Sequence, residues 1–373
     1  MNQLTLVWWM SLTLAVLALS TLSVLIVRRA RDEHRLAHDQ SVRLILQEIL
    51  FRFMVADPSR RETDLNNLLN FRRREASVLR KLAIDLFHLI KGSERDKLRN
   101  VLQLIGLRDD CLRDLEHGGI RERRLAAEAL HIFKDAEVQA ALLKALDDAD
   151  AETQVLAADS LLLIDALPDI HYLMGKLVPA IRMQSRDVRT LFRDIARYYP
   201  ARILARIERG GLSRVEKVLL AEAMAYSSDY CVLPSLQKWA EDSDVELRAT
   251  AMRALSGMQH PAVLPQIRAG LWDMQWQVRA VAARAAGRIG LTECISDLNF
   301  LIDDRNWWVR YRAAEALYKL GQAGIEVLQL RATYAGCGGF GRGARMAALV
   351  LDELGISTLS EVIYLPAVGE HHA

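Results

Sequence analysis

The chain has 373 residues, of which 51% are hydrophobic and 26% are charged, and its formal net charge is +2. This composition supplies a large core and differs from that of disordered segments, so we expect a protein that is folded almost throughout. A net charge so close to zero disfavours a non-specific nucleic-acid binder, which needs a positive field to collect phosphates, and we therefore expect no nucleic-acid partner.

The N-terminal segment is the most apolar part of the chain. Residues 1–27 contain no charged side chain, and Leu4 to Val27 is apolar apart from scattered serines and threonines. As a helix this stretch measures about 36 Å, enough to cross the hydrocarbon core of a bilayer. Basic residues follow the apolar run, the reverse of a secretory signal; they are Arg28, Arg29, Arg31 and Arg35. We predict a single-pass transmembrane anchor with a basic cytoplasmic flank at residues 1–30, in a bacterial inner membrane, with the C-terminal domain cytoplasmic.

Residues 31–92 contain two amphipathic segments, His38 to Met54 and Arg74 to Gly92. We predict a juxtamembrane helical region that forms an N-terminal cap. Between Arg28 and Asp110 there are 18 basic and 13 acidic side chains, an excess that favours proximity to anionic lipid. For the basic cluster Arg72 to Arg74 alone, the alternative is a solvated face of a capping bundle.

From residue 93 to residue 360 the sequence repeats about every 31 residues. The clearest units are QWQVRAVAARAAGRIG, Gln275 to Gly290, and NWWVRYRAAEALYKLG, Asn306 to Gly321. Two degenerate units fill the poorly matching stretch between Leu167 and Ser228. About eight units result, more than the three that a solenoid needs.

Each unit is expected to form two helices. In the first of the two clear units, apolar and small residues recur at the spacing of one helix face; they are Val278, Val281, Ala282, Ala285 and Ile289. Gly290 and Gly321 are expected to end the second helices. A sustained period-two pattern is missing from the sequence, so the predicted fold class is all-α.

The order Asp, Val-Arg, Ala-Ala and a final Gly in these units resembles the HEAT repeat, and is most similar to the short HEAT-like class of the phycobilisome-lyase type. The resemblance covers about two thirds of the chain and is strongest from Ala240 to Gly321. It implies a right-handed α-solenoid of about eight two-helix HEAT-like repeats, preceded by the transmembrane helix, with the second helices on the concave surface. It also implies binding rather than any one chemistry.

The resemblance gives the recurring Asp and Arg residues a structural role. In HEAT-like repeats, arginines such as Arg279 and Arg310 form an Asp–Arg ladder that ties one unit to the next, here with Asp273 and Asp304. Arg248, with Asp242 or Asp244, fits the same scheme.

Large side chains on the face of the second helices that points away from their apolar stripe are the best functional candidates. If these helices line the inside of the solenoid, the side chains form a concave patch of Trp, Tyr and Arg, the residue types that dominate protein-binding hot spots. The small Ala249 and Ala280 are expected to leave room beside Tyr311. A packing role is the alternative for Trp276 and Trp307. The predicted partner-binding residues are Trp276, Gln277, Arg284, Arg288, Trp308, Tyr311, Glu315 and Lys319.

The glycine-rich stretch Gly336 to Arg345 breaks the repeat period. An inter-helix insertion is favoured over an anion site served by Arg342 and Arg345, because neither a P-loop nor a dinucleotide fingerprint is present. Residues 361–373 are expected to be a C-terminal tail.

The remaining reactive side chains indicate neither redox nor metal chemistry. The cysteines are isolated, without a CxxC pair, and most are expected to fill the core; they are Cys111, Cys231, Cys294 and Cys337. His34 and His38 lack the Glu and the third ligand of a zinc site. We predict no cofactor and no metal.

These features predict a membrane-anchored cytoplasmic adaptor, not an enzyme, that binds protein partners and holds them at the membrane. One specific form is an accessory subunit of a bacterial membrane complex, such as one for polysaccharide synthesis or export. Two alternatives stay open. One is a lyase-like enzyme or enzyme subunit, by resemblance to phycobilin lyase repeats; the other is nucleic-acid binding, as in DNA glycosylases made of HEAT-like repeats.

Overall fold

The computed structural model describes residues 3–55, 61–336 and 341–356. All regular structure in these ranges is helical, which confirms the predicted all-α class. The chain divides into two compact units, Met1–Leu167 and Pro168–Ala373. The predicted tail, 361–373, lies outside the described residues.

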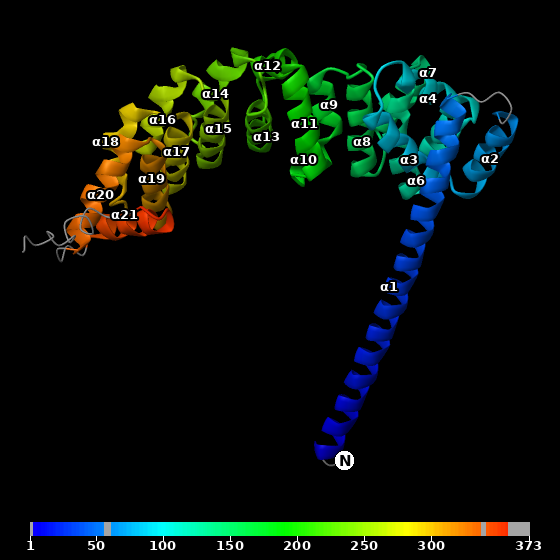
Figure 1. The fold of residues 1–373 in the computed structure, drawn as a ribbon, viewed down its shortest axis with the longest axis horizontal. Coiled ribbons are helices and arrows are strands. Elements are labelled where there is room, and N and C mark those ends of the chain that lie inside the picture. Colours follow the sequence, from blue (N-terminus) through cyan, green and yellow to red (C-terminus); the bar gives the residue numbers. More distant parts are fainter. Residues whose placement is uncertain (1–2, 56–60, 337–340, 357–373) are drawn as a thin grey trace, which may run out of the picture. The chain divides into compact units, whose positions relative to one another are not determined.

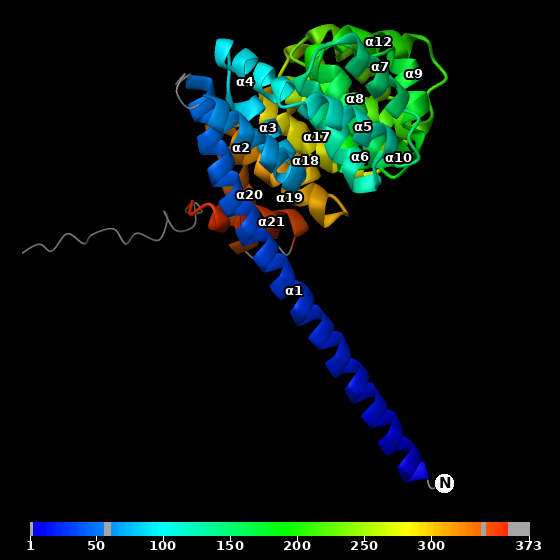
Figure 2. The same cartoon turned by 90° about the vertical axis from the view of Figure 1, so that its right-hand side faces the viewer.

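One long helix begins the first unit. α1 (Gln3–Val55) has 53 residues and runs without a break through the predicted anchor and the first amphipathic segment. It is continuous because the sequence from Arg28 to Val55 has no glycine or proline to interrupt it. In both views its first half projects away from the other helices of the unit (Figure 1, Figure 2).

The second half of α1 packs against α2, α3 and α4 through an apolar stripe. The buried side chains are Val42, Leu46, Ile49, Leu50 and Phe53. The neighbouring helices are α2 (Arg61–Arg74), α3 (Ala76–Leu89) and α4 (Ser93–Leu104).

Two helix pairs complete the first unit. α5 packs on α6 and α7 packs on α8, while α3, α6 and α8 lie against one another in sequence order. The bounds are α5 (Leu107–His117), α6 (Ile120–Ala129), η1 (Leu130–Ile132), α7 (Ala136–Ala145) and α8 (Ala151–Leu163).

The basic cluster at the end of α2 has a structural partner. Arg72 pairs with the carboxylate of Asp110, where Nη2 lies 2.7 Å from Oδ1, and its Nη1 donates to the carbonyl oxygen of Ile105 at 2.6 Å. The hydrogen bond from Arg72 holds the pKa of Asp110 below its usual value against the opposing effect of burial. Arg72 therefore joins α2 to α5 rather than offering a free charge to lipid.

The second unit is a row of six helix pairs. In the four pairs from α12 to α19 a short first helix is followed by a longer second helix, and α11, α13, α15, α17 and α19 pack successively against one another. Figure 1 shows α13, α15, α17 and α19 on the inner side of the curve that this unit makes, with α14, α16 and α18 outside. The described pairs from α5 to α21 number eight, in keeping with the predicted repeats.

The helices of the second unit follow in chain order. They are α9 (Ile170–Lys176), α10 (Val178–Arg182), α11 (Arg186–Tyr198), α12 (Pro200–Glu208), α13 (Arg214–Met224), η2 (Tyr230–Val232), α14 (Leu233–Trp239), α15 (Val245–Met258), η3 (Pro261–Val263), α16 (Leu264–Leu271), α17 (Trp276–Ile289), η4 (Thr292–Cys294), α18 (Ile295–Leu301), α19 (Trp307–Lys319), α20 (Gln322–Gly336) and α21 (Arg342–Glu353).

A ladder of charged side chains joins successive pairs, as predicted for Arg279, whereas Arg310 donates only to the backbone carbonyls of Asp304 and Arg305. Nε of Arg279 lies 2.8 Å from Oδ2 of Asp304, 25 residues further on, and Arg248 makes the same contact with Asp273 at 2.8 Å. Each aspartate also accepts a hydrogen bond from the backbone two residues later, which fixes the turn before the next second helix.

The expected partner of Arg248 was wrong. Its guanidinium meets Asp242 only at the backbone carbonyl, at 2.9 Å, donates also to the Ser243 carbonyl at 3.0 Å, and reaches forward to the carboxylate of Asp273. The Asp242 carboxylate is already taken by the backbone N–H of Asp244 at 3.0 Å and by Lys217 at 3.2 Å.

The second helices approach closely where their side chains are small. A Cβ added to Gly287 in α17 would lie 2.6 Å from the Cα of Ala316 in α19. Gly290 and Gly321 follow their helices with φ of +86° and +80°, as expected for helix-ending glycines.

Two cysteines fill the core. Cys111 and Cys294 are buried, and burial raises their thiol pKa to about 12 and about 11. Cys231 is exposed, and Cys337 lies outside the described residues.

Candidate partner-binding groove

The inner side of the second unit is hollowed over α15, α17 and α19. A cavity of about 430 Å³ lies there, which we call the arginine groove. Five of the predicted partner-binding residues line it: Trp276, Gln277, Arg284, Arg288 and Trp308. The other lining residues are Arg253, Ser256, Ala280, Val281, Ala285 and Arg312.

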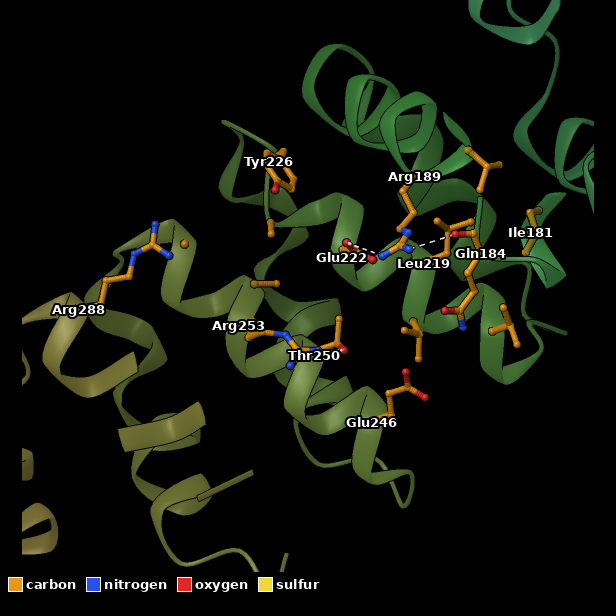
Figure 3. Close-up of a pocket in the computed structure, with 16 residues that line it drawn as sticks. Ile181, Gln184, Arg189, Leu219, Glu222, Tyr226, Glu246, Thr250, Arg253 and Arg288 are labelled. Atoms are coloured by element: carbon orange, nitrogen blue, oxygen red, sulfur yellow. Dashed lines mark hydrogen bonds and ion pairs between the residues drawn. The ribbon is translucent and has the colours of Figure 1, made fainter. Parts of the chain in front are cut away.

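A second cavity continues the arginine groove toward earlier repeats. It measures about 630 Å³, spans α10 to α17, and shares Arg253 and Arg288 with the arginine groove. Figure 3 shows Arg253 on α15 beside Thr250, Arg288 on the next second helix, and Arg189 directed toward Glu222. The two cavities form one surface along the second helices.

Local sequence explains how the groove residues are presented. The Asn306 side chain caps α19 by accepting a hydrogen bond from the backbone N–H of Trp308 at 2.9 Å, which starts the helix at Trp307. The buried stripe of α17, from Val278 to Ala286, faces its neighbours. Residues off that stripe, such as Arg284 and Arg288, therefore stand on the inner surface.

The arginine groove carries uncompensated positive charge. Arg284 and Arg288 are exposed and make no hydrogen bond or ion pair with any residue that the structure describes. Arg253 is exposed and donates only to the hydroxyl of Thr250, at 2.7 Å. No Asp or Glu occurs among the described residues that line this groove.

The acidic residues near the groove are already paired. Glu222 lies 3.8 Å from Arg189, and Glu246 accepts a hydrogen bond from Arg214 at 2.9 Å. Glu315 accepts hydrogen bonds from Lys319 and Arg312, at 2.6 and 2.5 Å. Although burial opposes its ionisation, these two partners lower the pKa of Glu315.

Aromatic side chains form one rim of the groove. Trp308 is 50% exposed and Trp276 is 37% exposed, so tertiary packing leaves much of both indoles free. Trp307 stacks on Tyr311 with centroids 5.2 Å apart and contacts Trp308 edge-on at 4.8 Å. Trp307 therefore buttresses the aromatic cluster.

Three predicted site residues, Tyr311, Glu315 and Lys319, do not line the groove. Tyr311 donates its hydroxyl hydrogen to Glu353 of α21 at 3.3 Å, and its pKa is raised by burial and by that carboxylate. These residues are one repeat beyond Ala280, Arg284 and Arg288, so they face the following pair. Ala280 consequently leaves room beside Trp308, not beside Tyr311 as expected.

Two arginines that line the groove are not among the predicted site residues. Arg253 is the repeat equivalent of Arg284, 31 residues earlier, and Arg312 is four residues after Trp308 on the same helix face. The repeat register indicates the first of these, and the i, i+4 rule indicates the second.

Near the glycine-rich stretch, for which an anion site was the less favoured interpretation, the described polar groups bind a carboxylate of the chain itself. The Gly343 backbone N–H, in the first turn of α21, donates to Oδ1 of Asp303 at 3.0 Å. Arg331 donates to the other oxygen of the same carboxylate at 2.6 Å. Residues 337–340 lie outside the described residues.

Titratable clusters suited to a metal are missing from the described ranges 3–55, 61–336 and 341–356. There, no group of three or more His, Cys, Asp or Glu side chains is arranged to hold an ion. His38 instead lies 3.2 Å from Glu75.

Residues 264–333 match the family of HEAT repeats. This segment holds α16 to α19, the pairs that carry the ladder contact between Arg279 and Asp304 and most of the arginine groove. The HEAT resemblance is confirmed over these residues, while the phycobilisome-lyase subtype stays a prediction.

Solved structures of other proteins resemble the chain at low identity. A Kap121p mutant shares 12% identity with a TM-score of 0.46, covering 88% of this chain and 48% of that one. Importin beta shares 13%, with a TM-score of 0.38 and coverage of 82% and 51%. The chain thus spans about half the length of these two. Human deoxyhypusine hydroxylase shares 18%, with a TM-score of 0.28 and coverage of 76% and 97%. No curated protein matches the chain.

One helical stretch has the length and composition to cross a membrane. The window Leu12–Arg29 in α1 has a mean hydropathy of 1.8, and none of it is buried within the described structure.

Proposed function

We propose that this chain is a scaffold that binds a protein partner in the arginine groove and is held at a membrane by the first half of α1. The observation that carries the proposal is the exposure of Trp276 and Trp308 on the inner surface, beside Arg253, Arg284 and Arg288, which pair with no carboxylate among the described residues. Trp and Arg are the side chains most enriched at protein-binding hot spots.

The architecture supports a binding role. A row of helix pairs presents a long continuous surface, and such surfaces accept extended peptides, helices or domains. The two cavities that share Arg253 and Arg288 extend this surface over several repeats. In this proposal the chain acts by binding and performs no chemistry of its own.

The apolar first half of α1 supports membrane attachment. Side chains such as Leu14, Leu17 and Val24 are at least 60% exposed. Such a run is costly in water and favourable in lipid. The arginines from Arg28 onward place the solenoid on the cytoplasmic side in this proposal. A specific form is an accessory subunit of a bacterial membrane complex such as one for polysaccharide synthesis or export.

Site-specific photocrosslinking in intact cells tests both parts. A photoreactive amino acid replaces Gln277 in the arginine groove, and a matched control carries it at Phe300, which is 62% exposed on α18 outside that groove. Each is made in the full chain and in a version lacking residues 1–27.

The expected result is a protein crosslinked from position 277 but not from 300, and captured in the membrane fraction only with residues 1–27 present. Capture that is equal from both positions contradicts the groove as the binding site. Membrane retention of the shortened chain contradicts the anchor.

A further inference from the structure

The same repeat position on four successive second helices carries, in order, Glu, Arg, Arg and Glu. Glu222, Arg253, Arg284 and Glu315 are each 31 residues apart, on α13, α15, α17 and α19. The two outer glutamates are paired, with Arg189 and with Lys319 and Arg312. The two inner arginines pair with no carboxylate among the described residues.

Arg288 adds a third free guanidinium one turn after Arg284 on the same face of α17. Gly257 occupies the equivalent position on α15, so no side chain of α15 stands opposite Arg288 at that level. Both residues line the larger cavity. The positive charge is therefore concentrated over α15 and α17 and ends at a glutamate on each side.

We propose that the occupant of the arginine groove is an acidic segment of a partner protein. Two or three of its Asp or Glu carboxylates bind Arg253, Arg284 and Arg288, and an apolar or aromatic side chain covers Trp276 and Trp308. This inference rests on the proposed scaffold function and names the chemistry of its partner.

Guanidinium geometry supports carboxylates as the ligands. Arginine offers planar paired donors that match a carboxylate, and such charge-assisted hydrogen bonds are about twice as strong as neutral ones. The neighbouring Ala280, Val281 and Ala285 provide apolar wall beside the guanidiniums. A ligand that is both acidic and apolar fits this lining better than a hydrophilic anion.

The short basic stretch argues against a polyanion. A nucleic acid needs a row of cations along its backbone, whereas here Glu222, Glu246 and Glu315 border the free arginines. The formal net charge of +2 gives no wider positive field.

Helix spacing suggests the spacing of the acidic residues. Adjacent packed helices lie about 8–10 Å apart, a span that about three residues of an extended peptide cover. Carboxylates about three residues apart can therefore reach Arg253 and Arg284 together.

Peptide binding to the full chain in nonionic detergent tests the inference. The probe is a fluorescent peptide in which Glu alternates with Leu and Phe, and its control has Gln at every Glu. Binding is measured by fluorescence anisotropy for the native chain, for the double variant Arg253→Glu and Arg284→Glu, and for Lys238→Glu. Lys238 is an exposed cation on the outer helix α14, so that variant makes one charge reversal of the same kind outside the groove.

We expect the Glu peptide to bind at least about tenfold more tightly than the Gln peptide, since each lost charge-assisted bond corresponds to about one power of ten. The double variant should lose this preference, and Lys238→Glu should keep it. Equal binding of the two peptides, or a preference that survives the double variant, overturns the inference. Circular dichroism melting of each variant confirms that these exposed substitutions leave the fold intact.

Two further experiments distinguish an acidic protein partner from other anions, and a failure of this inference from a failure of the scaffold function. In the first, anionic vesicles or duplex DNA are added to the chain lacking residues 1–27. If they bind, if the double variant abolishes that binding, and if the Glu peptide does not bind, the arginines recognise lipid or nucleic acid and the inference is overturned. A protein crosslinked from position 277 whose capture is unchanged by the double variant overturns the acidic partner class while the scaffold function stands.

Discussion

At the scale of single residues, the ladder arginines differ from the groove arginines in whether a carboxylate pairs with their charge. Arg279 is 18% exposed at its side chain and its partner Asp304 is 8% exposed, so the pair is largely removed from water. Arg284, five residues later on the same helix, is exposed and unpaired among the described residues. The first residue stabilises the stack of repeats, while the second is left for a ligand.

Replacing Arg279 by Ala should lower the free energy of unfolding by about 3 kcal/mol, because it strands a mostly buried Asp304 carboxylate. Arg310→Ala is the matched control. Arg310 has the same place in the next repeat but donates only to the carbonyls of Asp304 and Arg305, at 2.9 and 3.2 Å. Its removal should cost about 1 kcal/mol.

Urea unfolding followed by circular dichroism measures both. If both variants lose the same free energy of unfolding, the contact between Arg279 and the Asp304 carboxylate contributes nothing beyond the hydrogen bonds to backbone carbonyls that each arginine makes.

At the scale of helices, close approach between neighbouring second helices sets the geometry of the groove. α17 contributes buried small residues to this contact, among them Ala282, Ala283, Ala286 and Gly287. Short distances between helix axes bring Arg253 and Arg284, or Trp276 and Trp308, onto one surface. The groove depends on the small residues behind it.

Gly287→Ala should destabilise the chain by about 2 kcal/mol, because the new methyl group would meet the backbone of Ala316, which has no room to move. Gly175→Ala in α9 is the control, since nothing lies within 4 Å of its added Cβ. It should be neutral or gain up to about 1 kcal/mol from helix propensity. Thermal unfolding of the two variants distinguishes crowding from propensity, and a stable Gly287→Ala would refute the close packing.

At the scale of the whole molecule, the first half of α1 is separable from the folded part. Its apolar side chains are exposed, whereas Leu46, Ile49 and Leu50 in the second half are buried. The second half of this continuous helix therefore contributes to stability, while the first half carries the proposed membrane attachment.

Removal of residues 1–27 should change the free energy of unfolding by less than about 0.5 kcal/mol, as for other exposed positions. Leu46→Ala should cost about 3 kcal/mol, because its side chain is fully buried. Both are measured in the same nonionic detergent by chemical denaturation. A marked loss on deletion would indicate that the apolar half packs against the remainder of the protein.

Much of the fold could be predicted because its signals are local. The 31-residue period, the apolar stripe of α17 and the glycines at 290 and 321 are visible within short windows. The unbroken α1 was less accessible, because the change from an apolar to an amphipathic pattern near Arg28 suggests a boundary that the backbone does not have. For the site, periodicity identified the exposed face of α19 but not which neighbouring pair each residue faces.

The sequence by itself determined the all-α class and the repeat, since helix periodicity and turn signals act over a few residues. Only the tertiary structure decided which charges find partners, because those partners lie about one repeat away in the chain. Arg248 and Arg253 share one helix and one residue type, yet the first meets Asp273 of the next turn and the second stands in the groove without a carboxylate. Arg279 and Arg284 repeat the difference, and the groove arises from it.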